Sequence, residues 1–235
     1  MEVKNNSSVA KRLIIAIDGP SGAGKGTVAR QVAARLGYRH VDTGAMYRAL
    51  AWKAAHDGLD LTDEAAVSAL GARATFVLEG GRVEIDGHDV RAAIRTPEID
   101  KAAAAVARHP AVRKVLVAVQ RKLGDGGGVV MEGRDIGTVV FPDAELKVFL
   151  VADPWERARR RLIQRLDRHP TEDEIAAETD AIVHRDAKDA TQTVQATDAI
   201  LIDTTYLTQE DQVERIVALA KAVTRRPDKT SAVDE

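Results

Sequence analysis

The chain has 235 residues, 45% of them hydrophobic but only 3% aromatic, which suits one α/β domain with an insertion and an aliphatic core. Its 34 basic and 36 acidic residues give a formal net charge of −2, so neither nucleic acid nor a membrane surface is indicated as a partner. The absence of cysteine excludes disulfides and thiolate metal sites. No apolar segment approaches the roughly 20 residues of a membrane span, and the first residues are polar. We therefore expect a cytoplasmic protein, and a monomer.

Short apolar runs alternate with helical patterns along the chain. The five runs are residues 12–18, 38–42, 128–132, 146–152 and 199–203. Continuous runs of this kind suit strands that are buried on both faces of a parallel sheet. Helix signals lie between them, with Gly37 as a stop, Asp153 before Pro154 as a start, and Thr208 opening the last helix. The alternation predicts an α/β fold with an open, doubly wound parallel sheet of five strands.

Residues 63–127 break this alternation. A helical pattern is followed by three short strand patterns with Gly-Gly and Asp-Gly turns, and then by two helices that are separated near Pro110. We expect a small α+β insert here, within a core that comprises 12–62 and 128–224. The two ends, 1–11 and 225–235, are polar and non-periodic, which predicts disordered tails.

A glycine-rich stretch follows the first predicted strand directly. It consists of Gly19, Pro20, Ser21, Gly22, Ala23, Gly24, Lys25, Gly26 and Thr27. A strand, a glycine turn and a helix in this order predict a phosphate-binding loop of the P-loop NTPase type, in which main-chain amides cradle a nucleoside triphosphate and Lys25 bridges its β- and γ-phosphates. The usual hydroxyl after the lysine is replaced by Gly26, and Thr27 comes one place late. Thr27 is the candidate ligand of Mg²⁺.

Charged residues leave two other predicted strands at their carboxyl ends, where open α/β sheets bind ligands. Thr43 and Arg48 follow the second strand, and the sequence EGRD, residues 132–135, follows the third. Glu132 takes the position of a Walker-B acid near the metal, and Arg134 can bind a phosphate with two parallel hydrogen bonds. For Arg48 alone, a solvated helix arginine is the simpler interpretation.

An arginine-rich helix pair over residues 157–188 has the pattern of a lid. Arg157, Arg161, Arg165 and Arg168 are expected on one helical face, and Thr171 with Glu174 forms a capping box for the second helix. Such a pair can close over a triphosphate, with Arg157 and Arg161 as candidate contacts. An exposed charged face is the alternative.

The acceptor class follows from what the motifs lack. There is no N-K-x-D motif of a GTPase and no H-R-D-x-x-x-x-N loop that would supply a base to an alcohol. A monophosphate acceptor needs no base, because its second pKa is about 6 and it is already anionic at neutral pH.

Several motifs together resemble the bacterial cytidylate kinases. They are GPSGAGKGT, DTGAMYR, IRTPEI, VR at 112–113, EGRDIGTVVFPDA and RD at 185–186, in that order along most of the chain. The resemblance implies a CORE, an NMP-binding insert and a LID, and the transfer of phosphate from ATP to CMP or dCMP with Mg²⁺.

The resemblance also implies roles for individual residues. Thr43, Arg48 and Arg134 would hold the CMP phosphate, Arg113 and Asp135 would face the cytosine, and Arg185 and Asp189 would lie near the sugar and phosphates. The expected catalytic residues are Lys25, Arg48, Arg134 and Arg185. Two positions depart from the family pattern: Ala104 replaces a serine that touches the base, and Gln192 replaces a phosphate-binding arginine.

Two alternatives remain at this point. The same kinase frame could act on another small acceptor, such as UMP, shikimate or gluconate. A nucleotide-binding regulatory protein with a decayed site would also accommodate Ala104 and Gln192, although the intact Lys25, Arg134 and Asp135 speak against it.

Overall fold

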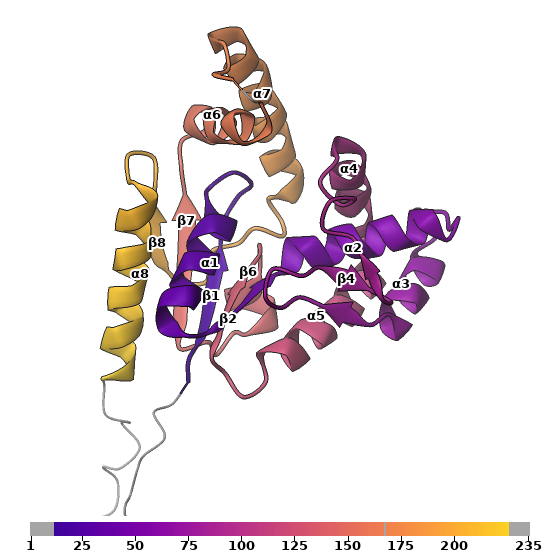
Figure 1. The fold of residues 1–235 in the computed structure, drawn as a ribbon, viewed down its shortest axis with the longest axis horizontal. Coiled ribbons are helices and arrows are strands. Elements are labelled where there is room, and N and C mark those ends of the chain that lie inside the picture. Colours follow the sequence, from indigo (N-terminus) through magenta and orange to yellow (C-terminus); the bar gives the residue numbers. More distant parts are fainter. Residues whose placement is uncertain (1–11, 167, 226–235) are drawn as a thin grey trace, which may run out of the picture.

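The computed structural model describes residues 12–166 and 168–225. Its larger sheet has five parallel strands in the order β2-β6-β1-β7-β8. These strands are β1 (Ile14–Asp18), β2 (Arg39–Asp42), β6 (Val129–Glu132), β7 (Leu146–Val151) and β8 (Ile200–Asp203). The predicted five-stranded α/β sheet is therefore confirmed (Figure 1).

Helices cover both faces of this sheet, because neighbouring residues of each strand point to opposite sides. Ile15 and Val130 belong to one buried cluster, which also holds the apolar residues of α1 (Lys25–Leu36) and α8 (Gln209–Thr224). Ala16 and Met131, one residue further along, belong to the cluster on the other face. Alternation with a period of two therefore divides the apolar runs between two cores, which is the physical basis of the doubly wound arrangement.

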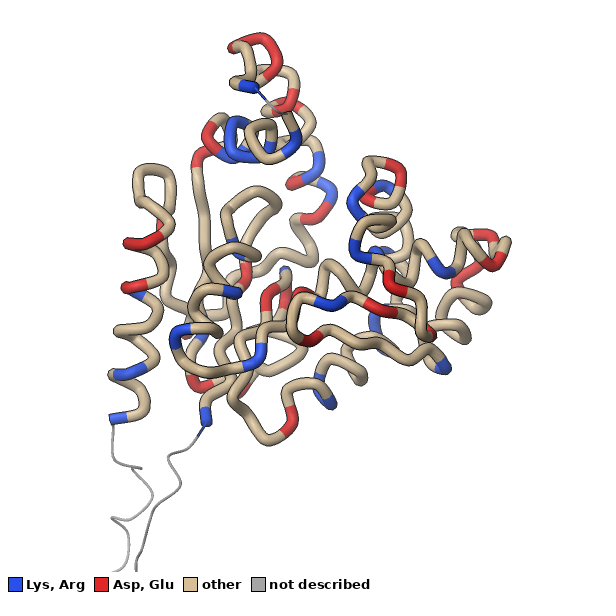
Figure 2. The backbone as a smooth tube through the Cα atoms, in the orientation of Figure 1, with Lys and Arg blue, Asp and Glu red and all other residues tan. Residues whose placement is uncertain are grey.

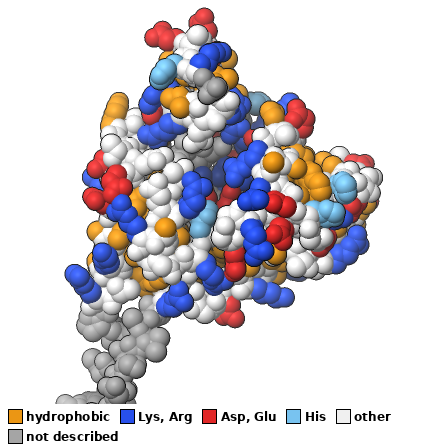
Figure 3. Space-filling view, viewed as in Figure 1, with side chains coloured by type: hydrophobic (Ala, Val, Ile, Leu, Met, Phe, Trp, Pro, Cys, Tyr) orange, Lys and Arg blue, Asp and Glu red, His pale blue; other side chains and the backbone are white. Residues whose placement is uncertain are grey.

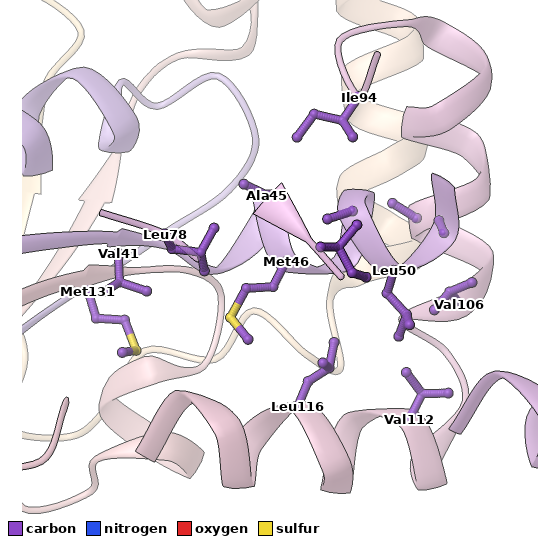
Figure 4. Close-up of a cluster of buried hydrophobic side chains, with 14 of the residues drawn as sticks. Val41, Ala45, Met46, Leu50, Leu78, Ile94, Val106, Val112, Leu116 and Met131 are labelled. Atoms are coloured by element: carbon purple, nitrogen blue, oxygen red, sulfur yellow. The ribbon is translucent and has the colours of Figure 1, made fainter. Parts of the chain in front are cut away.

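The second cluster extends without interruption from the sheet into the insert, residues 63–127. Its helical contributors are α2 (Thr43–His56), α3 (Glu64–Arg73), α4 (Pro97–Val106), α5 (Pro110–Gly124) and the π-helical turn η1 (Ile136–Val140). Figure 4 shows Met46 and Leu50 of α2 beside Val112 and Leu116 of α5. The insert also carries a small antiparallel sheet of β3 (Phe76–Val77), β4 (Glu84–Ile85) and β5 (His88–Asp89), as the turn signals predict.

Two more helices, α6 (Pro154–Arg165) and α7 (Glu172–Asp189), pack on each other as the α6–α7 hairpin. The predicted caps are confirmed: the Asp153 side chain accepts from two amides of α6, and Thr171 with Glu174 forms a capping box on α7. Arg168 was predicted to lie on one helical face with the arginines of α6. This prediction is wrong, because Leu166 takes an extended conformation and α6 ends at Arg165.

Of the predicted tails 1–11 and 225–235, residues 1–11 and 226–235 lie outside the described residues. Arg225 differs from the prediction, because it is the C-cap of α8. Within the described ranges, no helix is both long and apolar enough to cross a membrane.

Candidate active site

A cavity of about 1320 Å³ opens at the carboxyl edge of the larger sheet, between the P-loop, the insert and the α6–α7 hairpin. Figure 3 shows this face hollowed between the hairpin and the insert, with Lys and Arg side chains along the hollow. All of the predicted acceptor-side residues line it: Thr43, Arg48, Arg113, Glu132, Arg134, Asp135, Arg185 and Asp189. The cavity thus brings together side chains from the ends of β2 and β6, from α5 and from α7.

The P-loop, residues 19–27, connects β1 to α1 and forms one wall of the cavity. Gly19 lies so close to β7 that a Cβ atom there would stand 2.1 Å from the Leu150 carbonyl oxygen, so only glycine fits. Lys25 Nζ donates a hydrogen bond to Pro20 O at 2.8 Å. Burial, together with the charge of Arg134, lowers the pKa of Lys25 to about 7. A bound polyphosphate would restore its positive charge, because an opposite charge raises a lysine pKa.

Gly26, the unusual residue of the loop, lies against the carboxylate of Glu132. A Cβ atom at position 26 would stand 3.0 Å from Glu132 Oε1. The same carboxylate oxygen lies 3.1 Å from His40 Nε2, and Glu132 is only 7% exposed. The end of β6 and the start of α1 therefore meet through an acidic side chain, which a larger residue at 26 would push away.

Thr43 and Arg48 hold the junction between β2 and α2. Asp42 caps α2 by accepting from the Ala45 amide at 2.8 Å, and Arg48 Nη2 donates to the same carboxyl group at 2.9 Å. Although burial raises it, the pKa of Asp42 lies below its usual value because Arg48 and the Ala45 amide stabilise the carboxylate. The Thr43 hydroxyl donates to Glu132 O at 2.7 Å, which uses its single hydrogen and leaves main-chain amides as the donors of this turn.

Arg134 and Arg185 lie close together with one carboxylate between them. Asp189 Oδ2 is 4.0 Å from Arg134 Nε and 3.7 Å from Arg185 Nε. Burial and the charge of Arg185 lower the pKa of Arg134, because both disfavour its cation, and the charges of Asp189, Glu132 and Asp186 oppose this shift. The Nε atoms of Arg48 and Arg185 are buried without a hydrogen-bond partner. This side of the cavity therefore has a surplus of positive charge and free donors, which favours an anionic ligand.

A second group of polar side chains lies deeper, around Arg113 of α5. Its guanidinium contacts the Asp135 carboxylate through Nη2 and the Gln192 side-chain oxygen through Nη1, the latter at 3.1 Å. Burial raises the pKa of Asp135, and the Arg113 charge opposes this shift. Ala104 lines the same cavity without a polar atom on its side chain.

The two lid arginines predicted to bind ATP lie in different places. Arg161 lines the cavity. Arg157 is 3% exposed and lies behind the P-loop, where it donates to Ser21 O at 3.0 Å and to Ala152 O at 3.1 Å and pairs with Asp186. Its guanidinium therefore supports the loop, which differs from the predicted direct contact with the triphosphate.

Two other arginines of this segment, Arg165 and Arg168, lie on an exposed charged surface, which was the alternative to a lid. Arg165 pairs with Glu178 at 2.6 Å and Arg168 pairs with Glu174, and both arginine side chains are largely exposed. Figure 2 shows the Lys and Arg positions gathered along α6.

Asp18, which sequence reasoning missed, positions the EGRD segment. Its buried carboxylate accepts from the amides of Ile136 and Gly137, at 2.9 and 2.7 Å, directly after Asp135. Burial raises the pKa of Asp18 to about 6. The sequence feature that could have identified Asp18 is an acid at the end of an otherwise apolar strand.

Sequence reasoning also missed His40 of β2 as a site residue, and no local pattern in the sequence marks it.

An amide-lined P-loop that faces an arginine cluster at the carboxyl edge of a doubly wound sheet defines a P-loop phosphotransferase. The cytidylate kinase family model matches residues 15–222, and the chain belongs to this family.

Curated relatives agree with this assignment, and a solved structure agrees with the fold. The chain is 50% identical over 223 residues to a cytidylate kinase of Pelotomaculum thermopropionicum, covering 88% of this chain and 96% of the relative. It is 47% identical over 215 residues to that of Desulfitobacterium hafniense, covering 89% and 93%. A solved structure of an uncharacterized protein from Eubacterium ventriosum is 12% identical, with a TM-score of 0.51, over 90% of this chain and 99% of that one. This last similarity supports the fold alone.

Proposed function

We propose that this protein transfers the γ-phosphoryl group of ATP to CMP and dCMP, giving ADP and CDP or dCDP. The observation that carries the proposal is the pair of Arg134 and Arg185 on the cavity wall, two guanidinium groups between which the described residues place one carboxylate, that of Asp189. Two guanidinium groups with one carboxylate favour a ligand with more than one negative charge. The membership of the cytidylate kinase family supports CMP as that ligand.

In the proposed reaction, ATP lies on the P-loop, with its β- and γ-phosphates on the main-chain amides and Lys25. The acceptor phosphate lies against Arg48, Arg134 and Arg185. An oxygen of the CMP phosphate attacks the γ-phosphorus in line, and the bond from this phosphorus to the β,γ-bridging oxygen breaks. The arginines stabilise the charge that spreads over the transferred group, and no base is needed because the attacking oxygen is already ionised.

The residues at the loop fit Mg²⁺ as a cofactor. The Thr27 hydroxyl lines the cavity and makes no side-chain hydrogen bond among the described residues, and the Glu132 carboxylate stands beside the loop. The described residues contain no group of three or more His, Cys, Asp or Glu that could hold a metal, so the protein ligands of Mg²⁺ would be few, as is usual for a cation that binds through phosphates and water. When bound, Mg²⁺ would neutralise phosphate charge; Thr27 and Glu132 would hold it.

Base recognition in the proposal lies with Arg113 and Asp135. A carboxylate can accept a hydrogen bond from the exocyclic amine of cytosine, a group that uracil lacks. Arg113 holds this carboxylate in place. The proposal also includes the division into a CORE (12–62 and 128–224), an NMP-binding insert (63–127) and a LID (157–188), and a cytoplasmic monomer that acts on small molecules.

A coupled assay of ADP release with CMP, dCMP, UMP, AMP and shikimate tests the proposal. We expect turnover with CMP and dCMP to exceed that with the other acceptors by about 100-fold or more, as in sites built around a hydrogen-bonding group. A preference for UMP or shikimate would move the activity to another acceptor, and ATP binding without turnover would indicate a regulatory protein.

A further inference from the structure

The α6–α7 hairpin has a hydrophobic cluster of its own. Its buried members are Ala158, Leu162, Ile175 and Ile182, and they do not join either cluster on the sheet. The hairpin therefore holds itself together, but apolar packing contributes little to where it lies on the rest of the protein. Its position must depend on the chain connections at its ends and on polar contacts.

Two arginines of α6 attach the hairpin to the P-loop side of the molecule. Arg157 donates to Ser21 O of the P-loop, as described above. Arg160 donates to the Thr204 hydroxyl at 3.1 Å and to Thr204 O at 2.6 Å, at the end of β8. Both attachments lie at the base of the hairpin, and neither reaches the insert across the cavity.

Arg161 attaches the hairpin in the opposite direction, to the insert. Its Nη2 atom lies 3.0 Å from Asp100 Oδ2 of α4, while its Nε atom lies 2.9 Å from Glu178 Oε1 of α7. Among the described residues, this is the only hydrogen bond or ion pair that joins α6 or α7 to residues 63–127. Arg161 and Asp100 both line the cavity, so the pair crosses between two of its walls.

Asp100 stands on a wall that is itself fixed. It lies in the first turn of α4, where its amide donates to Thr96 O at 3.0 Å. Ala103 and Val106 of the same helix are buried in the cluster shared with α2. Because α4 is fixed by this packing, the Asp100 carboxylate can determine the position of the Arg161 guanidinium. Its side chain is 29% exposed and that of Arg161 is 26% exposed, so the pair is only partly screened by solvent.

We propose that Asp100 is a positioning residue that acts through Arg161, by holding α6 over the cavity and so coupling the lid to the acceptor-side wall. This inference rests on the proposed function, together with the expectation from the sequence that Arg161 contacts ATP. With the pair intact, part of the ordering of the lid precedes nucleotide binding, so both nucleotides meet a more preorganised site. Without it, each nucleotide must supply this ordering itself, which weakens both apparent affinities and leaves the chemical step unchanged.

The kinetic test compares Asp100→Asn with Glu98→Gln. Glu98 lies in the same first turn of α4, is exposed and forms no ion pair among the described residues, so its variant removes the same charge near the helix terminus. We expect Asp100→Asn to raise KM for both ATP and CMP about threefold to fivefold, the size typical of one partly exposed ion pair, with kcat within twofold. Glu98→Gln should leave both KM values within twofold, and Asp100→Glu should restore them.

A structural readout does not depend on turnover. The natural chain has no cysteine, so Ala92→Cys in the insert and Ala177→Cys in α7, both exposed, allow specific spin labelling of one pair of sites. We expect Asp100→Asn, added to this pair, to lengthen and broaden the label-to-label distance distribution, and Glu98→Gln to leave it unchanged.

The outcomes separate the two proposals. If Asp100→Asn lowers KM for ATP, the carboxylate competes with phosphate for Arg161 and the inference is overturned. Equal effects of Asp100→Asn and Glu98→Gln, or no effect on KM and distance, also overturn it. Failure of the natural protein to phosphorylate CMP would refute the proposed function, whereas the distance measurement would still decide whether Asp100 holds the lid.

Discussion

Gly26 and Glu132 meet so closely that a Cβ atom on residue 26 would stand 3.0 Å from the carboxylate oxygen Oε1. This contact gives a physical reason for the glycine that follows Lys25 in the P-loop. A serine or threonine at this position would need the Glu132 carboxylate, which comes from β6, to shift by a few tenths of an ångström. His40 Nε2, 3.1 Å from the same oxygen, holds this acid from the other side.

We therefore expect Gly26→Ser to impair the enzyme, although it restores the commoner loop sequence. The added side chain must displace Glu132, and a small misplacement near the reacting phosphates can reduce kcat/KM by about 10-fold or more. Steady-state kinetics with ATP and CMP measure this. Gly26→Ala is the matched control for the hydroxyl. A serine variant that equals or exceeds the natural protein would contradict the steric explanation.

The raised pKa of Asp18 predicts a particular dependence of stability on pH. The pKa of Asp18 in the folded protein is about 6, above the ordinary value of 3.8. During acidification the folded protein therefore binds this proton at a higher pH than the unfolded chain does. The group therefore opposes folding when ionised above pH 6, and this opposition is relieved as the pH falls from 6 toward 4. Asp18→Asn removes the titration. The melting temperature of the natural protein relative to the variant should rise over that interval; a constant difference would show that the pKa is not raised.

Arg134→Ala should remove stabilisation of the transferred phosphoryl group. We expect kcat to fall by at least about 100-fold, because arginines that act on this transition state contribute 10³-fold or more. ATP affinity should change little, since the P-loop amides and Lys25 bind its phosphates. Arg35→Ala is the control, because Arg35 is 43% exposed and pairs with Glu210 on the surface. Near-normal turnover of the Arg134 variant would refute its assigned role.

Gln192→Arg tests whether the enzyme lacks a cation. In the structure, Gln192 Oε1 accepts from Arg113 Nη1 at 3.1 Å, and an arginine would replace this acceptor by a second positive charge beside Arg113. We expect KM for CMP to rise severalfold, about what one lost charge-assisted hydrogen bond contributes, without a gain in kcat. Gln195→Arg, at an exposed position in the same segment, controls for added charge. A higher kcat for the Gln192 variant would show that a missing arginine limits the reaction.

Local patterns in the sequence were sufficient for the elements and for the phosphate loop. The predicted strand 146–152 is β7 (Leu146–Val151), and Thr171 with Glu174 forms the expected capping box. Such features depend on residues within a few positions of one another, such as a continuous apolar run between breakers or a hydroxyl before a helix. The convergence of cations at the carboxyl edge also followed, because parallel strands end on the same side.

The partners of the charged side chains were decided only by the tertiary structure. Asp18 binds the amide of Ile136, 118 positions away, and Arg161 meets Asp100 across the cavity, 61 positions away. Arg157 belongs to the same arginine-rich segment as Arg161 but lies behind the loop, since its position on α6 faces Ser21. An arginine has the same donors wherever it stands. What it binds depends on the acceptors that packing brings within reach, and no local pattern encodes that distance.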